Sequence, residues 1–169
     1  ASRDEVENQV WALDRRGGEG FALTNIEQGI SGYRWSPDGT RLLLTIRDAE
    51  EKDEDKKENA PPDPWVIDRL QFKRDNVGYL TGDRRTHLYV FEIESGELRQ
   101  LTTGDTDESL GVWSPDGTLI AFASNRTDEP DGNENSDIWI VGSDLEEPTD
   151  NPRRVTTNEG SDRSPAWSP

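Results

Sequence analysis

The stretch RWSPDGTRLLLTIRD (residues 34–48) predicts a β-strand ending at Trp35, a tight turn and a second strand. Pro37 fixes φ at the second turn position, Asp38 favours the third, and Gly39 can adopt a positive φ as the next strand begins. The apolar run that follows has no helical period and is bounded by turn residues, as expected for a strand.

The same turn recurs along the chain. Trp113 follows Trp35 by 78 residues, and Trp167 follows Trp113 by 54. The same offsets relate LTN at 23–25, LTT at 101–103 and VTT at 155–157. Landmarks that keep common offsets make a repeat, and repeats of about 40 to 50 residues indicate solenoids or propellers.

Each repeat predicts four short strands. The first ends in the Trp and the second follows the turn, while the third and fourth resemble HLYVFEI (87–93) and LRQLT (98–102). Four antiparallel strands form one blade of a propeller. The sequence therefore predicts an all-β fold, a partial β-propeller of four-stranded antiparallel blades with WD40-like repeats.

The offsets also divide the chain. The expected parts are the outer strands of a preceding blade at 1–30, a blade at 31–103 with an insertion at 48–86, a second blade at 104–157 and the first strand of the next blade at 158–169. Known propellers close with four or more blades, so these parts alone leave sheet edges exposed. We expect either a piece of a larger protein or self-association through the blade edges.

Two elaborations occupy equivalent places. The insertion at 48–86 and the segment TDEPDGNEN at 127–135 both join the second strand of a blade to the third. In an up-and-down blade these connections emerge on one face, opposite the SPDG turns. The sequence therefore predicts that both elaborations lie on the same face.

Composition limits the classes of partner. The 169 residues carry a net charge of −17, which opposes binding to nucleic acid and to anionic membranes. Arg outnumbers Lys 15 to 4, so a halophilic source is a hypothesis, with an ordinary acidic protein as the alternative. The sequence has no Cys, no apolar run of bilayer-spanning length and no recognisable signal peptide. We expect a cytoplasmic protein, with the periplasm and secretion left open.

Few residues indicate catalysis. No G-x-S-x-G nucleophile motif occurs, and the only histidine, His87, is interpreted as hydrogen-bonded between blade strands. With one His and no Cys, neither a catalytic zinc nor another cofactor is expected. A weak calcium candidate has oxygen ligands at alternate positions, but it lacks the Gly and closing Glu of an EF-hand, and turn chemistry explains the same residues. Its members are Asp131, Asn133, Asn135 and Asp137.

Two segments carry a resemblance to known families. WSPDGTLIAFASNR (113–126), followed by DIWIV and RRVTT, resembles the repeat of TolB-type propellers and of the amino-terminal propellers of prolyl oligopeptidase family serine peptidases. The stretch from Ile67 to Thr102 is similar to acylaminoacyl-peptidase-like members, which carry an Arg-Leu, a Gly-Tyr and an Arg-Arg-x-His-Leu string before a strand.

The peptidase resemblance implies a non-catalytic role for this chain. In that family the propeller precedes an α/β-hydrolase domain, caps its active site and limits the size of the peptide substrate. No triad residue matches here, so the chain alone is expected to be inactive. The positions that fall in the matching stretch, and for which it implies a substrate-facing or interdomain role, are Arg69, Tyr79, Arg84 and Arg85.

Three functions therefore remain open. The chain is the cap of an oligopeptidase or acylaminoacyl peptidase, a TolB-type scaffold for a protein partner, or a structural repeat without a ligand. Local packing of Tyr79 and salt bridges of the arginines are the structural alternative to a role in substrate binding. The insertion at 48–86 favours the peptidase.

Overall fold

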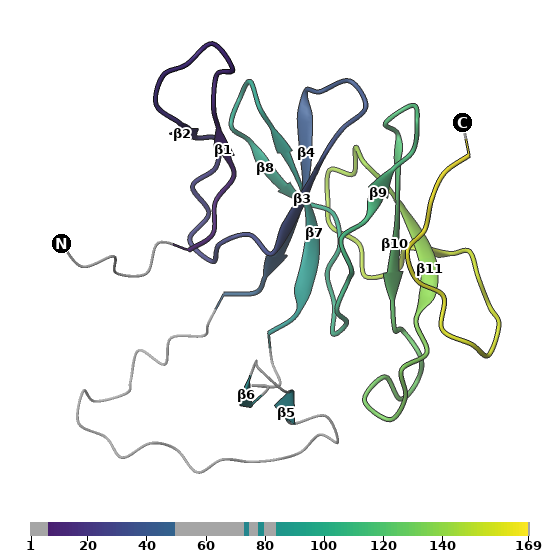
Figure 1. Ribbon diagram of the computed structural model, residues 1–169. Coiled ribbons are helices and arrows are strands. Elements are labelled where there is room, and N and C mark those ends of the chain that lie inside the picture. Colours follow the sequence, from purple (N-terminus) through teal and green to yellow (C-terminus); the bar gives the residue numbers. More distant parts are fainter. Residues whose placement is uncertain (1–6, 50–72, 75–77, 80–83, 169) are drawn as a thin grey trace, which may run out of the picture.

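The computed structural model describes residues 7–49, 73–74, 78–79 and 84–168, and all regular elements within these ranges are β-strands (Figure 1). The first blade contains β3 (Gly32–Trp35), β4 (Arg41–Arg47), β7 (Thr86–Glu92) and β8 (Leu98–Gln100). The second contains β9 (Val112–Trp113), β10 (Leu119–Ser124), β11 (Asp137–Gly142) and β12 (Arg153–Arg154).

Both blades have the same topology. Their strands pair in chain order, β3-β4-β7-β8 and β9-β10-β11-β12, and every pair is antiparallel. In the first blade Trp35 lies opposite Leu42, and Arg47 lies opposite Thr86, the last residue of the expected insertion. The predicted all-β partial propeller is confirmed.

Two smaller sheets flank the blades. β1 (Trp11–Ala12) pairs with β2 (Phe21–Ala22) before the first blade, and β5 (Lys73–Arg74) pairs with β6 (Gly78–Tyr79) within the insertion. The backbone amide of Val10 donates to Thr24 Oγ1, as those of Leu88 and Ile138 do to Thr102 and Thr156. β1 and β2 therefore stand where the third and fourth strands of a preceding blade would.

The SPDG turns owe their shape to local hydrogen bonds. In the second turn Asp116 Oδ1 accepts bonds from Ser114 Oγ at 2.6 Å and from Thr118 N at 3.0 Å, and Asp38 does the same in the first. Gly39 and Gly117 both have a φ of 73°, the left-handed region that glycine tolerates. The identical geometry of the two turns explains the repeated sequence.

Apolar clusters join neighbouring blades. Leu43, Leu88, Val90 and Leu101 of the first blade pack with Trp113, Ile120, Phe122 and Val141 of the second. A second cluster packs the β1–β2 segment on the first blade through Val10, Ile26, Ile30, Leu42, Leu44, Ile46 and Phe91. The core is therefore a set of thin layers between sheets, as the low hydrophobic content requires.

The repeated tryptophans bond successive inner strands. Trp113 Nε1 donates to Arg34 O at 3.4 Å, and Trp167 Nε1 donates to Val112 O at 3.1 Å. Trp113 is buried, but Trp35 is 50% exposed. Trp35 differs because the described residues before it provide only outer strands and no inner strand against which it could pack.

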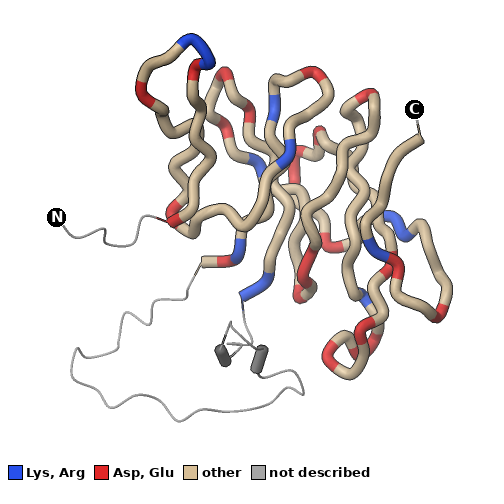
Figure 2. The backbone as a smooth tube through the Cα atoms, in the orientation of Figure 1, with Lys and Arg blue, Asp and Glu red and all other residues tan. Residues whose placement is uncertain are grey.

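The two ends of the sheets carry different connections. The SPDG turns lie at one end, whereas the ends of β4 and β7 that border the insertion lie at the other end with the loop at 125–136 (Figure 1). Acidic residues gather in the loops at both ends, and the strands carry few (Figure 2). We call the end that carries the insertion the insertion face.

Candidate functional site

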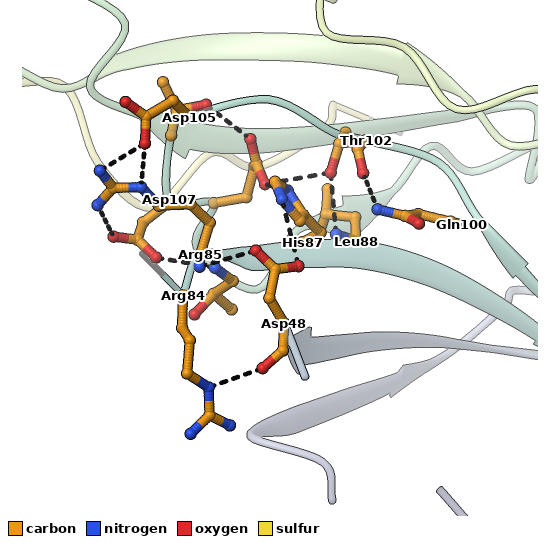
Figure 3. Close-up of polar contacts among 12 residues, drawn as sticks. Asp48, Arg84, Arg85, His87, Leu88, Gln100, Thr102, Asp105 and Asp107 are labelled. Carbon is orange, nitrogen blue, oxygen red and sulfur yellow. Dashed lines mark hydrogen bonds and ion pairs between the residues drawn. The ribbon is translucent and has the colours of Figure 1, made fainter. Parts of the chain in front are cut away.

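The segments that lead into and out of the insertion are held together. We call residues 47–48 and 84–87 the insertion neck. Asp48 N donates to Arg85 O at 2.7 Å, and Arg85 N donates to the Asp48 carboxylate at 2.9 Å (Figure 3). Arg84 Nε donates to Asp48 O at 2.8 Å. These bonds extend the β4–β7 ladder by one step, so the insertion leaves the blade from a fixed base.

Arg85 attaches the neck to the loop between the blades. Its guanidinium contacts Asp105 Oδ1 at 2.6 Å and Asp107 Oδ2 at 3.6 Å, and its side chain is only 16% exposed. The same Asp107 accepts a bond from Thr86 N at 2.8 Å. Both carboxylates are mostly exposed, so the pairs contribute little to stability, but they fix the direction of the Arg85 side chain.

A buried polar network extends from His87, the last residue of the neck. His87 Nδ1 donates to Glu108 Oε2 at 2.8 Å, and His87 Nε2 lies 3.6 Å from Asp48 Oδ1. Thr102 Oγ1 also donates to Glu108 Oε2, and Arg126 pairs with Glu108 Oε1. Both His87 and Glu108 are nearly inaccessible to solvent. The network therefore joins the first blade, the connecting loop and the second blade.

The charges around His87 change its protonation. Burial alone would lower the pKa of His87, but the hydrogen bond to Glu108 and the charges of Glu108, Asp48 and Asp107 together raise that pKa above its ordinary value. A protonated imidazole satisfies both flanking carboxylates. His87 Nδ1 is held by its hydrogen bond to Glu108, whereas Nε2 contacts Asp48 at ion-pair distance, so the imidazole stabilises the site.

The repeat explains part of this network. Gln9, His87 and Asp137 occupy equivalent positions at the start of the third strand, and the first and last accept a bond from the Thr of their own repeat. In the first blade Thr102 instead donates to Glu108. The predicted hydrogen-bonded role of His87 is thus observed, with a partner in the connecting loop. Glu108 was missed because one acid among 36 carries no sequence signal.

The four residues implied by the peptidase resemblance fall in different places. Arg69 lies outside the described residues, and for Tyr79 only the backbone, in β6, is described. Arg84 and Arg85 come together at the neck, where their contacts are structural. A substrate-facing or interdomain role for the four stays a prediction.

The calcium candidate stays a prediction as well. The Asp137 carboxylate is held by Arg154 and Thr156, and Asn133 Nδ2 donates to Thr127 Oγ1 and Glu129 O. These contacts occupy the Asp137 carboxylate and the Asn133 amide, whereas the buried Asn135 Oδ1 has no hydrogen-bond partner among the described residues. Over the ranges that the structure describes, no group of three or more His, Cys, Asp or Glu residues is arranged to hold a metal ion.

The described ranges also contain no helix that is long and apolar enough to cross a bilayer.

A hollow of about 480 Å³ opens beside the network at the inner strands. We call it the inner hollow. Its walls come from three consecutive repeats, with Arg34, Val112 and Pro165 as one residue from each, and Asp107 and Arg163 also line it. Its lining includes serines such as Ser109 and Ser124 and apolar residues such as Leu110 and Ala123. Such a site can accept a small polar ligand.

Repeated four-stranded sheets joined through apolar layers define the class of this protein: a partial β-propeller. No family model matches the chain. The chain is 33% identical over 136 residues to the uncharacterised Bacillus subtilis peptidase YuxL. This alignment covers 79% of this chain and 20% of YuxL. The chain thus spans about a fifth of the length of this curated relative.

Solved structures share the fold. Acylaminoacyl peptidase from Pyrococcus horikoshii matches with a TM-score of 0.60 and 18% identity, over 88% of this chain and 21% of that one. TolB from Acinetobacter baumannii matches with a TM-score of 0.52 and 15% identity, over 95% of this chain and 29% of that one. The expected resemblance to both kinds of propeller is confirmed for the fold.

Proposed function

We propose that this chain is the non-catalytic propeller portion of a serine peptidase of the acylaminoacyl peptidase kind. The observation that carries the proposal is the 33% identity to a peptidase over 79% of the chain. Its partner is an α/β-hydrolase domain of the same parent protein, and the substrate of the parent enzyme is a peptide.

In this proposal the propeller caps the active site and limits the size of the substrate. The insertion is suited to that role because its base is fixed by Arg85 and by the network of His87 and Glu108. A loop that discriminates by size must keep its position, and the buried polar network of His87 and Glu108 at its base provides that rigidity. Arg84 and Arg85, with Arg69 and Tyr79, would face the hydrolase domain or the substrate.

The parent reading frame gives the first test. A G-x-S-x-G motif followed by an Asp and a His downstream of residue 169 supports the peptidase. A reading frame that encodes further blades and then stops contradicts it and favours a TolB-type scaffold that binds a protein partner. The structural match to TolB covers 95% of this chain, and this observation supports the second function as the alternative.

The cap role has its own test in the parent enzyme. We expect Arg85→Gln to loosen the insertion and raise kcat/KM for long peptides relative to short ones. Arg153→Gln is the matched control, since Arg153 is exposed on the outer strand β12. If the ratio of kcat/KM for long peptides to kcat/KM for short peptides is the same in wild type, Arg85→Gln and Arg153→Gln, the neck has no role in size selection.

A further inference from the structure

The inner hollow differs in charge from the rest of this acidic chain. Two arginines line it, Arg34 from β3 and Arg163 from the segment before Trp167. Of the two acidic residues in its wall, Glu108 is fully committed to His87, Thr102 and Arg126. The other, Asp107, accepts a bond from Thr86 N and faces Arg85.

The two arginines are not committed in the same way. Within the part of the chain that the structure describes, Arg34 has no carboxylate partner, and its side chain is exposed. Arg163 lies 3.9 Å from Glu134, but these side chains are 62% and 87% exposed, so the pair contributes little. The hollow is therefore lined by two arginines that have no buried carboxylate partner, while its own carboxylates are paired with other cations.

The walls of the hollow are fixed. Trp113 Nε1 holds the carbonyl of Arg34, and Trp167 Nε1 holds that of Val112. Between Arg163 and Pro165, Ser164 has a φ of 57°, the only positive value among the described non-glycine residues. A positive φ is uncommon for a residue other than glycine, and the residue before a proline favours extended backbone. Backbone strain of this kind concentrates at functional sites.

We propose that the inner hollow binds a carboxylate through Arg34 and Arg163. Guanidinium groups bind carboxylates with charge-assisted hydrogen bonds, and a hollow of about 480 Å³ accommodates a ligand of the size of a short peptide. The ligand is the C-terminal carboxylate of a short peptide. This last identification rests on the proposed function, whereas the carboxylate site itself does not.

The test is a titration of the whole 169-residue chain at constant ionic strength. The backbone amide chemical shifts of the chain are measured as one of three ligands is added: N-acetyl-Ala-Ala, the C-terminal amide of that peptide, or acetate. We expect saturable shifts around the hollow for the free acid and none for the amide. Arg34→Gln combined with Arg163→Gln should weaken binding about tenfold or more, because both charge-assisted bonds are lost. Arg153→Gln should bind as the wild type does.

Each outcome decides one part of the proposal. Equal binding of the acid and the amide, or full binding by the double variant, overturns the carboxylate site. Acetate that binds as tightly as the peptide supports the site but overturns the peptide ligand. Circular dichroism of the double variant separates a loss of binding from a loss of folding. Failure of the proposed function is recognised separately, by the absence of a hydrolase domain in the parent frame.

Discussion

At the scale of single residues, His87 contributes stability that depends on its charge. The imidazole lies between Glu108 at 2.8 Å and Asp48 at 3.6 Å, and both carboxylates favour the protonated form. The pKa of His87 is therefore higher in the folded chain than in the unfolded chain, where it is about 6.5. The stabilisation is complete below the unfolded pKa and is lost as the pH rises through the folded pKa.

Replacement of His87 by Gln tests this linkage. We expect the difference in unfolding free energy between wild type and His87→Gln to be largest near about pH 5 and to shrink toward about pH 9. Urea unfolding at a series of pH values measures it. A difference that stays constant over this range would show that the charge of His87 contributes nothing.

Asp116 gives the opposite sign. Its bonds from Ser114 and from the amide and hydroxyl of Thr118 lower the pKa of Asp116 to about 2. The stabilisation is present above the ordinary value of 3.8 and is lost as the pH falls toward 2. We expect Asp116→Asn to lose less stability than wild type on acidification, measured by the melting temperature. Asp128 lies in an exposed loop, and the control variant Asp128→Asn should show the same fall in melting temperature on acidification as the wild type.

At the scale of elements, the residue before β9 lies so close to β10 that it leaves no room for a side chain. A Cβ at Gly111 would lie 2.7 Å from Ile120 Cγ2 and 2.9 Å from Ala121 O. We expect Gly111→Ala to destabilise the fold by about 1–3 kcal/mol, because the buried β10 backbone cannot move away. Gly142→Ala is the matched control, since its nearest atoms would lie 3.8 Å away. Equal unfolding free energies for the two variants would show that β10 does yield.

The elements differ in how far sequence alone could predict them. The SPDG turn and its two strands were predictable because Asp38 and Asp116 make only local bonds, and local chemistry repeats with the sequence. The contact of His87 with Glu108 spans 21 residues and depends on how the blades pack, so no spacing rule indicates it. The inner hollow depends on three repeats meeting, which the offsets alone do not describe.

At the scale of the whole molecule, the net charge of −17 opposes the compact state. Salt screens this repulsion, so we expect the melting temperature to rise between about 0.05 M and about 2 M KCl. The combined variant Glu146→Gln, Glu147→Gln removes two exposed charges and should show a smaller rise. A melting temperature that does not depend on salt would contradict the halophile hypothesis.

The exposed apolar residues concern the whole molecule as well. Leu13 is 68% exposed, whereas Phe91 and Val141, at the same position in the two complete blades, are 6% and 5% exposed. Trp35 is likewise more exposed than Trp113. At the opposite side of the molecule Val155 is 50% exposed, while its equivalent Leu101 is fully buried. The two sides are therefore the two halves of a blade interface.

Such complementary sides can associate head to tail, since a heterologous contact leaves one side of each copy free for the next. We expect the weight-average mass of the 169-residue chain in sedimentation equilibrium to rise with concentration, and more at high salt, where repulsion is screened. Leu13→Asp should suppress this rise because it places a charge in the contact. Leu98→Asp, on the outer strand β8, is the matched control and should associate as wild type does. A mass that remains that of one chain at every concentration would mean that these sides stay exposed to water and do not form a contact.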